Sequence, residues 1–424
     1  MTQRVFGEGN PATSLTEEAI LSIIEGGTPR HLFQGKRVLV LTPDATRTCP
    51  LPVMIRAVRR VIGSRCARLD FMVALGTHPI MAEADILELY GISPAERQGA
   101  YATSRFLNHR WDLPQSFRLI GVLTEDQVES ISQGLFREEV PITINKAVYD
   151  YDLVLILGPV FPHEVVGFSG GAKYLFPGIS GGEFLHFFHW LGAVITCMRI
   201  IGVKDNPVRR LIHEALANVS VPVHCLAMVV ASDGNLCGLY AGDPVNAWSA
   251  AADLSARMHI VMKQKPYRLV LGHAPRRYDE IWTAGKVMYK LEPVVADGGT
   301  LIIYAPHIRE ISRVWGESLK QVGYHVLDYF LAQMERFRQI PRGVLAHSTH
   351  VRGLGTYVDG VEKSRIQVVL ATGIPRPVCE QIHLGYLNPD DIRISDYENR
   401  EEESVLFVDQ AGEILYRLEG HGES

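Results

Sequence analysis

Residues that could carry out chemistry gather directly after apolar stretches of the chain. The first group, Asp44-Ala45-Thr46-Arg47, follows the run KRVLVLT at 36–42 and offers a carboxylate, a hydroxyl and a guanidinium within four residues. A guanidinium forks onto a carboxylate or a phosphate, so Arg47 is a candidate anion ligand. A local cap with a surface ion pair explains Asp44 and Arg47 equally well, and both interpretations stay open here.

A histidine follows the next apolar run. LDFMVALG at 69–76 leads into Thr77-His78-Pro79. Imidazole titrates near neutral pH, which suits proton transfer, whereas a hydrogen-bonded structural histidine is the common alternative.

The most informative segment runs from 158 to 178 and carries a lysine among glycines. Gly167, Gly170 and Gly171 allow backbone amides to approach a ligand closely, as phosphate cradles require, and Lys173 is placed to neutralise phosphate or to act as a nucleophile. Neither the Walker A spacing nor the G-x-G-x-x-G fingerprint is present. A purely structural glycine-rich turn is the alternative.

A pair of histidines follows at 186 and 189, in a segment that reads as the start of a helix. Residues three apart share a helix face, so His186 and His189 could reach one site or one metal. Their aromatic neighbours equally allow a packed helix with satisfied imidazoles.

The elements that must position these residues read as strands and helices in alternation. Continuous Val-, Ile- and Leu-rich runs at 36–42, 69–76, 117–123 and 152–158 predict strands buried on both faces, with helices between them. Ligands bind beyond the carboxyl ends of such strands, which is where the polar groups lie. A second set of runs, at 267–275 and 298–307, predicts another α/β domain.

The predicted organisation is therefore α/β, with two α/β domains that have largely parallel sheets. The N-terminal domain covers 1–248 and holds the glycine-rich loop with Lys173 and the histidines, a connecting helix covers 249–266, and the C-terminal domain covers 267–424.

Composition narrows the possible partners. The 424 residues are 47% hydrophobic and carry a formal net charge of -5 with well-mixed signs, which argues against nucleic acid as a ligand. Neither a signal peptide pattern nor an apolar stretch long enough to span a bilayer is present, so we expect a cytoplasmic protein that does not bind membranes.

Taken together, the motifs resemble those of the nickel-pincer-nucleotide-dependent lactate racemase family. That family shows a D-x-T-R loop, a G-x-H loop, the long motif P-H-x-x-x-G-F-S-G-G-x-K-x-x-x-P-G, and a trailing histidine. Here these are Asp44 to Arg47, Gly76 to His78, Pro162 to Gly178, and His189. The resemblance is dense over 37–190 and weaker in the second domain.

The resemblance implies a role for each matching residue, and an active site in the cleft between the two domains. Lys173 would hold the cofactor covalently, and His189 would ligate its nickel. His78 and His163 would be the catalytic acid and base. The remaining implied contacts are with the cofactor, through Asp44, Thr46, Ser169, Gly170 and Gly171, and with the substrate, through Arg47, Lys286 and Thr283. Thr283 stands where the family has a glutamine, which implies altered recognition of the carboxylate or a substrate larger than lactate.

The implied function is that of a racemase or epimerase that inverts C2 of a small 2-hydroxy acid. The C2 hydride would pass to and from the nickel-pincer nucleotide, a pyridinium-3-thioamide-5-thiocarboxylic acid mononucleotide that separate maturation proteins supply. Two alternatives remain: a non-catalytic protein that binds a hydroxy acid or nucleotide, and a zinc-dependent lyase or hydrolase that uses His163, His186 and His189. The sequence leaves open the oligomeric state and the roles of His109 and His186.

Overall fold

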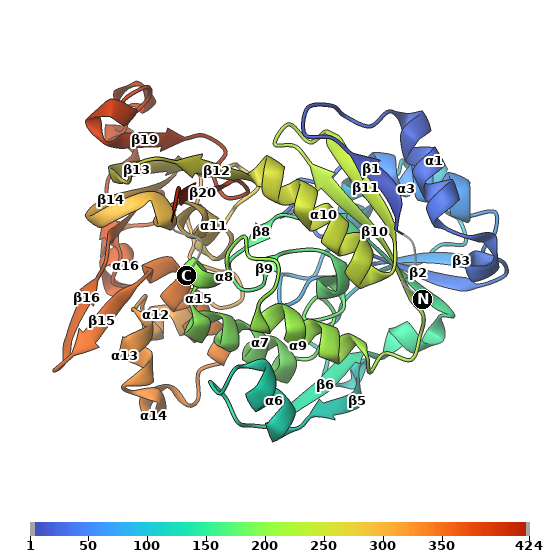
Figure 1. Ribbon diagram of the computed structural model, residues 1–424, viewed down its shortest axis with the longest axis horizontal. Coiled ribbons are helices and arrows are strands. Elements are labelled where there is room, and N and C mark those ends of the chain that lie inside the picture. The colour runs from blue at the N-terminus through green and yellow to red at the C-terminus, as the bar shows by residue number, and fades with distance from the viewer. Residues whose placement is uncertain (1–4, 421–424) are drawn as a thin grey trace. The chain divides into compact units, whose positions relative to one another are not determined.

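Two units of α/β structure make up the chain in the computed structural model, which describes residues 5–420 (Figure 1). Unit 1 contains the chain up to Phe161 together with Phe168–Leu185 and Pro207–Met258. Unit 2 contains Pro162–Gly167, His186–Asn206 and the chain from His259 onward. The chain therefore passes between the units five times.

Unit 1 is built on a seven-stranded sheet in the order β1-β11-β10-β7-β2-β3-β4. Its strands are β1 (Phe6–Gly9), β2 (Arg37–Thr42), β3 (Arg68–Val73), β4 (Phe106–Asn108), β7 (Leu153–Pro159), β10 (Val223–Val230) and β11 (Leu236–Gly242). The five strands from β10 to β4 are parallel, and β1 and β11 add an antiparallel edge. Residues 38–41 are all completely buried, as expected for a strand covered on both faces.

One predicted strand is present but lies outside this sheet. The run at 117–123 forms β5 (Phe117–Leu123), which pairs antiparallel with β6 (Val140–Asn145) in a separate two-stranded sheet. Leu119 is 58% exposed, so this run is covered on one side at most. An apolar run alone does not distinguish a strand that is buried on both faces from one that is covered on a single face.

Helices surround the sheet of unit 1. They are α1 (Glu17–Gly27), α2 (Arg30–Phe33), α3 (Leu51–Ile62), α4 (Glu83–Leu89), α5 (Pro94–Gln98), α6 (Glu125–Ile131), α9 (Pro207–Leu216) and α10 (Pro244–His259), with 3-10 turns η1 (Pro114–Ser116), η2 (Lys146–Asp150) and η3 (Gly171–Tyr174). Helix α1 packs on α3 and on β11. Ile24, Met54 and Val58 of these two helices join the strands in one buried apolar cluster.

Unit 2 contains a five-stranded sheet, entirely parallel, in the order β18-β17-β14-β13-β19. Its strands are β13 (Tyr267–His273), β14 (Val295–Ala305), β17 (Gln367–Thr372), β18 (Gly385–Tyr386) and β19 (Val405–Val408), and smaller pairs join β12 (Ile260–Lys263) to β20 (Leu415–Leu418) and β15 (Gly355–Val358) to β16 (Val361–Ser364). Its helices are α8 (Cys197–Ile200), α11 (Ile281–Leu291), α12 (Gly316–Val322), α13 (Leu327–Leu331), α14 (Met334–Phe337), α15 (Arg342–Arg352) and α16 (Arg376–Gln381), with 3-10 turns η4 (Glu292–Val294), η5 (Pro389–Asp391), η6 (Ile394–Asp396) and η7 (Glu401–Glu403).

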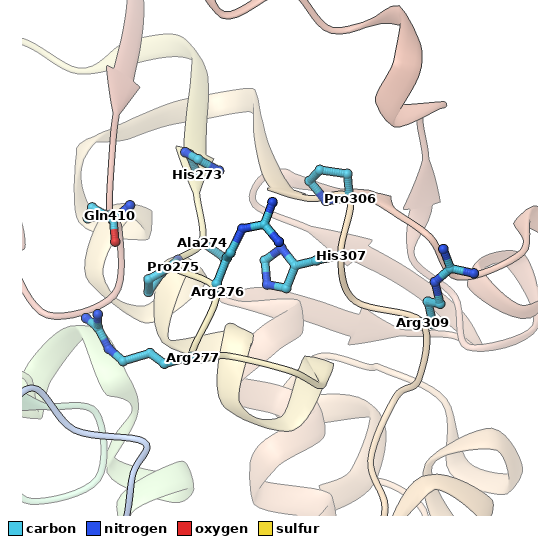
Figure 2. A pocket seen from close by; sticks show the side chains of 9 residues that line it. All are labelled: His273, Ala274, Pro275, Arg276, Arg277, Pro306, His307, Arg309 and Gln410. Carbon is cyan, nitrogen blue, oxygen red and sulfur yellow. The ribbon is translucent and has the colours of Figure 1, made fainter. Parts of the chain in front are cut away.

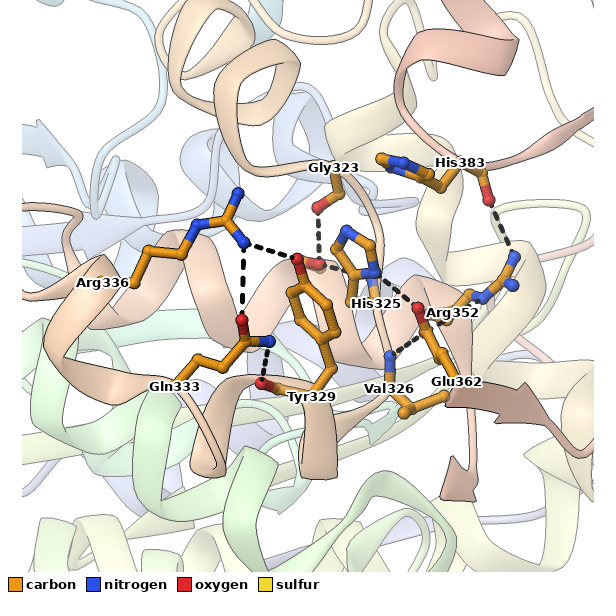
Figure 3. A network of polar contacts seen from close by, with 10 residues as sticks. Gly323, His325, Val326, Tyr329, Gln333, Arg336, Arg352, Glu362 and His383 are labelled. Carbon is orange, nitrogen blue, oxygen red and sulfur yellow. Dashed lines mark hydrogen bonds and ion pairs between the residues drawn. The ribbon is translucent and has the colours of Figure 1, made fainter. Parts of the chain in front are cut away.

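A polar network ties the turn before α13 to the β15–β16 hairpin (Figure 3). His325 Nδ1 lies 2.6 Å from Glu362 Oε2, and the other carboxylate oxygen accepts the amide of Val326 at 2.8 Å. The His325 ring stacks on Tyr329 with 3.8 Å between the ring centroids. The network satisfies a half-buried carboxylate, which would otherwise be costly to remove from water.

The boundaries between the units differ from the predicted domain limits in two places. Segments 162–167 and 186–206 belong to unit 2, although they were assigned to the 1–248 domain, because side chains such as Ile201 pack in the apolar core of unit 2. The expected connecting helix at 249–266 corresponds to α10 (Pro244–His259), which begins earlier and gives way to β12. Helix α7 (Gly182–Ile195) starts in unit 1 and ends in unit 2.

Candidate active site

Asp44 and His78 meet at the carboxyl ends of two neighbouring parallel strands in unit 1. Asp44 follows β2 and His78 follows β3, and His78 Nδ1 is in direct contact with Asp44 Oδ2. An ionised carboxylate only accepts hydrogen bonds, so the ring nitrogen Nδ1 donates and Nε2 keeps its lone pair. The arrangement is that of a base whose ring is oriented by a carboxylate.

Neighbouring groups hold both members of this pair. Thr46 donates to Asp44 Oδ1 through its hydroxyl at 2.7 Å and its amide at 3.1 Å. The indole Nε1 of Trp111 donates to the His78 carbonyl at 2.7 Å. Arg47, half-buried, lies in the same loop and acts electrostatically on Tyr174.

The glycine-rich segment folds into a tight loop after β7. Gly170 and Gly171 have φ values of +84° and +58°, a backbone conformation that side chains strongly disfavour. A Cβ at Gly171 would lie 2.7 Å from the Trp248 side chain, and one at Gly170 would lie 2.7 Å from Val160. The glycines are therefore required by the loop itself, and Lys173 is carried on the η3 turn that follows them.

Two residues that the sequence did not single out hold this loop, which we call the lysine loop (168–178). The Arg209 guanidinium of α9 donates to the carbonyls of Phe168 and Gly170, and Trp248 Nε1 of α10 donates to the Ser169 carbonyl at 2.9 Å. Arg209 lies over the Trp248 ring at 3.9 Å, and burial lowers its pKa to about 9. Three consecutive carbonyl groups are thus fixed by side chains from two helices.

The lysine loop also contacts the strand ends that carry the carboxylate and the histidine. The amide of Gly76 donates to the Gly178 carbonyl at 2.9 Å. A Cβ at Gly158 would lie 2.0 Å from Tyr174 Oη, so this tyrosine packs directly on the backbone of β7. The Ser169 hydroxyl is engaged with backbone, since it accepts from the Phe161 amide at 3.0 Å. Unit 1 therefore brings Asp44, Thr46, Arg47, His78, Ser169, Gly170, Gly171 and Lys173 into one neighbourhood.

Unit 2 contains the other predicted histidine, His163, in β8 (Pro162–His163). Its side chain is buried, and Nδ1 accepts the amide of Val165 at 3.2 Å, with Glu164 Oε2 at 3.4 Å. Because Nδ1 accepts, the proton of the neutral ring lies on Nε2. Lys290 anchors this segment through a hydrogen bond to the Pro162 carbonyl.

His189 lies on α7 beside two further histidines of unit 2 that the sequence interpretation missed. Burial, followed by the charges of His350 and His189, lowers the pKa of His347 well below its ordinary value. His347 Nδ1 and the Tyr289 hydroxyl are 3.0 Å apart, and the ring stacks on Trp282 at 4.1 Å. The i, i+3 spacing of His347 and His350 in a helical segment was the signal that could have found them.

Helix α11 carries both residues that were predicted from the family resemblance as substrate contacts. Thr283 and Lys286 are buried and lie three residues apart on one helix face. The Lys286 ammonium lies 4.6 Å from the centroid of the Tyr278 ring. The Thr283 hydroxyl donates to the Glu280 carbonyl at 3.0 Å, which leaves its oxygen able to accept.

Of the two histidines of open role, His109 is buried and His186 is half-buried. His109 Nδ1 lies 3.2 Å from the Asn145 amide nitrogen, and burial lowers the pKa of His109 to about 4. Burial, then the charge of Arg342, lowers the pKa of His186 to about 4. Within residues 5–420, no three His, Cys, Asp or Glu side chains are gathered as a metal site, so His163, His186 and His189 do not form a three-ligand group.

Comparison with known proteins shows one family and two characterised proteins to which this chain is similar in sequence. The family described as "Lactate racemase N-terminal domain" matches residues 8–198. A lactate racemase of Thermoanaerobacterium thermosaccharolyticum is 24% identical over 309 residues, which cover 70% of this chain and 67% of the relative. A lactate racemase of Lactiplantibacillus plantarum is 23% identical over 284 residues, which cover 65% of this chain and 61% of the relative.

Two solved structures are similar over almost the whole chain. A protein from Thermotoga maritima is 30% identical, covers 97% of this chain over its own full length, and superposes with a TM-score of 0.89. The lactate racemase apoprotein from T. thermosaccharolyticum is 20% identical, with a TM-score of 0.71 over 96% of this chain and 94% of its own. The second likeness is one of fold.

Proposed function

The chain belongs to the lactate racemase family, and from this premise we propose that it inverts C2 of a small 2-hydroxy acid. The observation that carries the proposal is the Asp44–His78 pair, which lies at the strand ends of unit 1 next to the loop that bears Lys173. A base oriented by a carboxylate beside a tight glycine loop is more than a binding protein requires.

In this proposal His78 takes the proton of the substrate hydroxyl at its Nε2. The Asp44 carboxylate keeps the other ring nitrogen protonated and stabilises the imidazolium that forms. His163 is the second proton carrier, on the opposite face of the planar intermediate: it donates as an imidazolium, next to the Glu164 carboxylate at 3.4 Å from Nδ1, and is left neutral. The face to which the C2 hydride returns sets the configuration, and the hydroxyl of each enantiomer would need its own proton carrier, one on each side.

The residues around the lysine loop fit a phosphate-bearing cofactor. Lys173 supplies a positive charge two residues after Gly171, in a loop whose backbone turns through positive φ at Gly170 and Gly171. We propose that Lys173 holds the nickel-pincer nucleotide covalently, that His189 ligates its nickel, and that Thr46 and the glycine amides bind along it. When bound, this cofactor supplies an electron-poor ring that accepts and returns the C2 hydride.

Substrate binding is proposed for Arg47, Lys286 and Thr283. Arg47 forks onto the carboxylate, and Lys286 adds a second positive charge. Threonine is shorter than the glutamine that the family has at this position, so the site of this chain takes a 2-hydroxy acid with a larger side chain than lactate.

Within residues 5–420, no helix is long and apolar enough to cross a bilayer.

The proposal is tested on protein produced together with the maturation enzymes of the cofactor. We expect an adduct mapped to Lys173 by mass spectrometry, stoichiometric nickel, and C2 inversion of chiral 2-hydroxy acids. Lys173→Ala should lose the adduct and all inversion, whereas Lys204→Ala, a change outside the lysine loop, should keep both. Full inversion by the Lys173→Ala variant, or a wild-type protein with adduct and nickel that inverts none of the acids, would overturn it.

A further inference from the structure

Unit 2 contains a cavity of about 890 Å³ whose lining includes none of the residues with a proposed catalytic role (Figure 2). Its lining combines cationic, imidazole and proline side chains with one amide, and consists of His273, Ala274, Pro275, Arg276, Arg277, Pro306, His307, Arg309 and Gln410. A cavity of this volume is within the range of small-molecule binding sites and larger than a three-carbon acid needs.

The cavity lies where the architecture of a parallel sheet places ligands. His273 ends β13, Pro306 directly follows β14, and Gln410 follows β19 by two residues. In the sheet, β14, β17 and β18 follow one another on one side of β13, whereas β19 lies on its other side. The direction in which successive strands are added therefore reverses at β13. Such reversals, at the carboxyl ends of parallel strands, open a crevice between the diverging loops.

The charges around this cavity are unbalanced. Arg276 and Arg309 are both exposed, and neither has an ion-pair partner within residues 5–420. The carboxylates nearest in sequence are already committed, since Asp279 and Glu310 bind Arg313 at 2.7 and 2.9 Å. Two fixed positive charges therefore remain at the cavity for a ligand to neutralise.

The third arginine and the two histidines are held in place by the protein. Arg277 pairs with the buried Glu413 at 3.1 Å. His307 Nε2 donates to the Tyr278 carbonyl at 2.9 Å, so its Nδ1 is left as an acceptor, and His273 Nδ1 lies 2.7 Å from Asp409. These contacts fix the walls of the cavity, and the exposed Arg276 and Arg309 add its two unpaired positive charges.

We propose that this cavity binds a small phosphate monoester, such as a sugar phosphate or a mononucleotide. Two unpaired guanidinium groups match the charge of a phosphate dianion and the geometry of its oxygens, and the volume leaves room for the organic part of the ester. The proposal does not depend on the racemase activity, because the cavity-lining residues and the proposed catalytic residues are separate sets.

The test is a calorimetric titration of the full-length protein, without cofactor, with ribose 5-phosphate, inorganic phosphate and citrate. We expect ribose 5-phosphate to bind, and the double variant Arg276→Ala/Arg309→Ala to bind it at least about tenfold more weakly, as the loss of charge-assisted hydrogen bonds predicts. Arg376→Ala, which removes an exposed arginine of α16 that pairs with Glu380, is the matched control and should bind within about twofold of wild type.

A second variant separates this site from the lysine loop, which also suits phosphate. Lys173→Ala should leave the Arg276- and Arg309-dependent binding unchanged, whether or not the chain is a racemase. Binding that is lost in Lys173→Ala but kept in the double arginine variant would overturn the proposal. So would the absence of binding, or a preference for citrate over ribose 5-phosphate.

Discussion

At the scale of single residues, the contact between Asp44 and His78 makes the clearest prediction about the reaction. Asp44→Asn keeps the size of the side chain but removes the charge that fixes the ring tautomer and stabilises the imidazolium. We expect kcat for C2 inversion to fall about a hundredfold, and the acidic limb of the pH–rate profile, which reports the base, to move. Kinetics from pH 5 to 9 on cofactor-loaded protein would measure both.

The control for this change is the amount of cofactor on Lys173, which mass spectrometry gives directly. The adduct on Asp44→Asn is measured on the same sample, and kcat is expressed per cofactor-loaded chain, so that a change in loading is separated from the loss of the contact with His78. An unchanged kcat with an unchanged pH profile would show that Asp44 does not orient the base.

A second prediction at this scale concerns stability and pH. The buried ring of His109 has a pKa of about 4, below the ordinary 6.5, because burial disfavours its charged form. The unfolded chain takes up a proton as the pH falls below 6.5 while the folded chain does not. His109 therefore contributes stability that is complete above pH 6.5 and is lost as the pH falls toward 4.

Denaturant unfolding at pH 7 and pH 5 measures this effect. Replacing His109 with glutamine should reduce the pH dependence of the unfolding free energy by about 1 kcal/mol per pH unit. His31→Gln, a change at an exposed histidine, should leave that dependence as it is in wild type. Equal slopes for His109→Gln and wild type would mean that the ring is protonated inside the fold.

At the scale of elements, the lysine loop depends on two helices that follow it in the chain. Trp248→Phe keeps a ring beneath Arg209 but removes the indole donor to the Ser169 carbonyl. A buried carbonyl without its partner costs about 1 to 2 kcal/mol, so the unfolding free energy should fall by that amount and less cofactor should attach to Lys173.

The comparison with Trp248→Leu separates the hydrogen bond from the packing of the ring. Leucine removes the contact with the Arg209 guanidinium as well, so its loss of stability should exceed that of phenylalanine. If Trp248→Phe matched wild type in both stability and adduct yield, the indole donor would have no part in holding the loop.

The elements also explain which parts of the structure were predictable. Strands β2, β3 and β7 were evident as continuous apolar runs, and Asp44, His78 and Lys173 were found because they follow those runs. Arg209 and Trp248 were missed because their partners are backbone carbonyls that become near neighbours only after folding. β5 was assigned to the wrong kind of sheet, since an apolar run does not reveal how many of its faces are covered.

At the scale of the whole molecule, the five passages between units mean that neither unit is a continuous piece of chain. The fragment 259–424 lacks Cys197 and Ile201, which belong to the apolar core of unit 2. We expect this fragment alone to bind a hydrophobic dye and to unfold without a sharp transition. Adding a separate peptide of residues 186–206 should make the unfolding transition of the fragment sharper. A cooperative transition of the fragment alone would contradict this, with the full chain as the reference.

The same passages also have a consequence for synthesis of the chain on the ribosome. Segment 186–206 carries Cys197 and Ile201, which lie in the apolar core of unit 2, yet all the other members of that core follow His259. At about 5 to 20 residues per second, the roughly 220 residues that follow position 206 take on the order of 10 to 40 seconds to emerge. For that time Cys197 and Ile201 are without the core that covers them, so the nascent chain should be a client of chaperones that bind exposed hydrophobic segments.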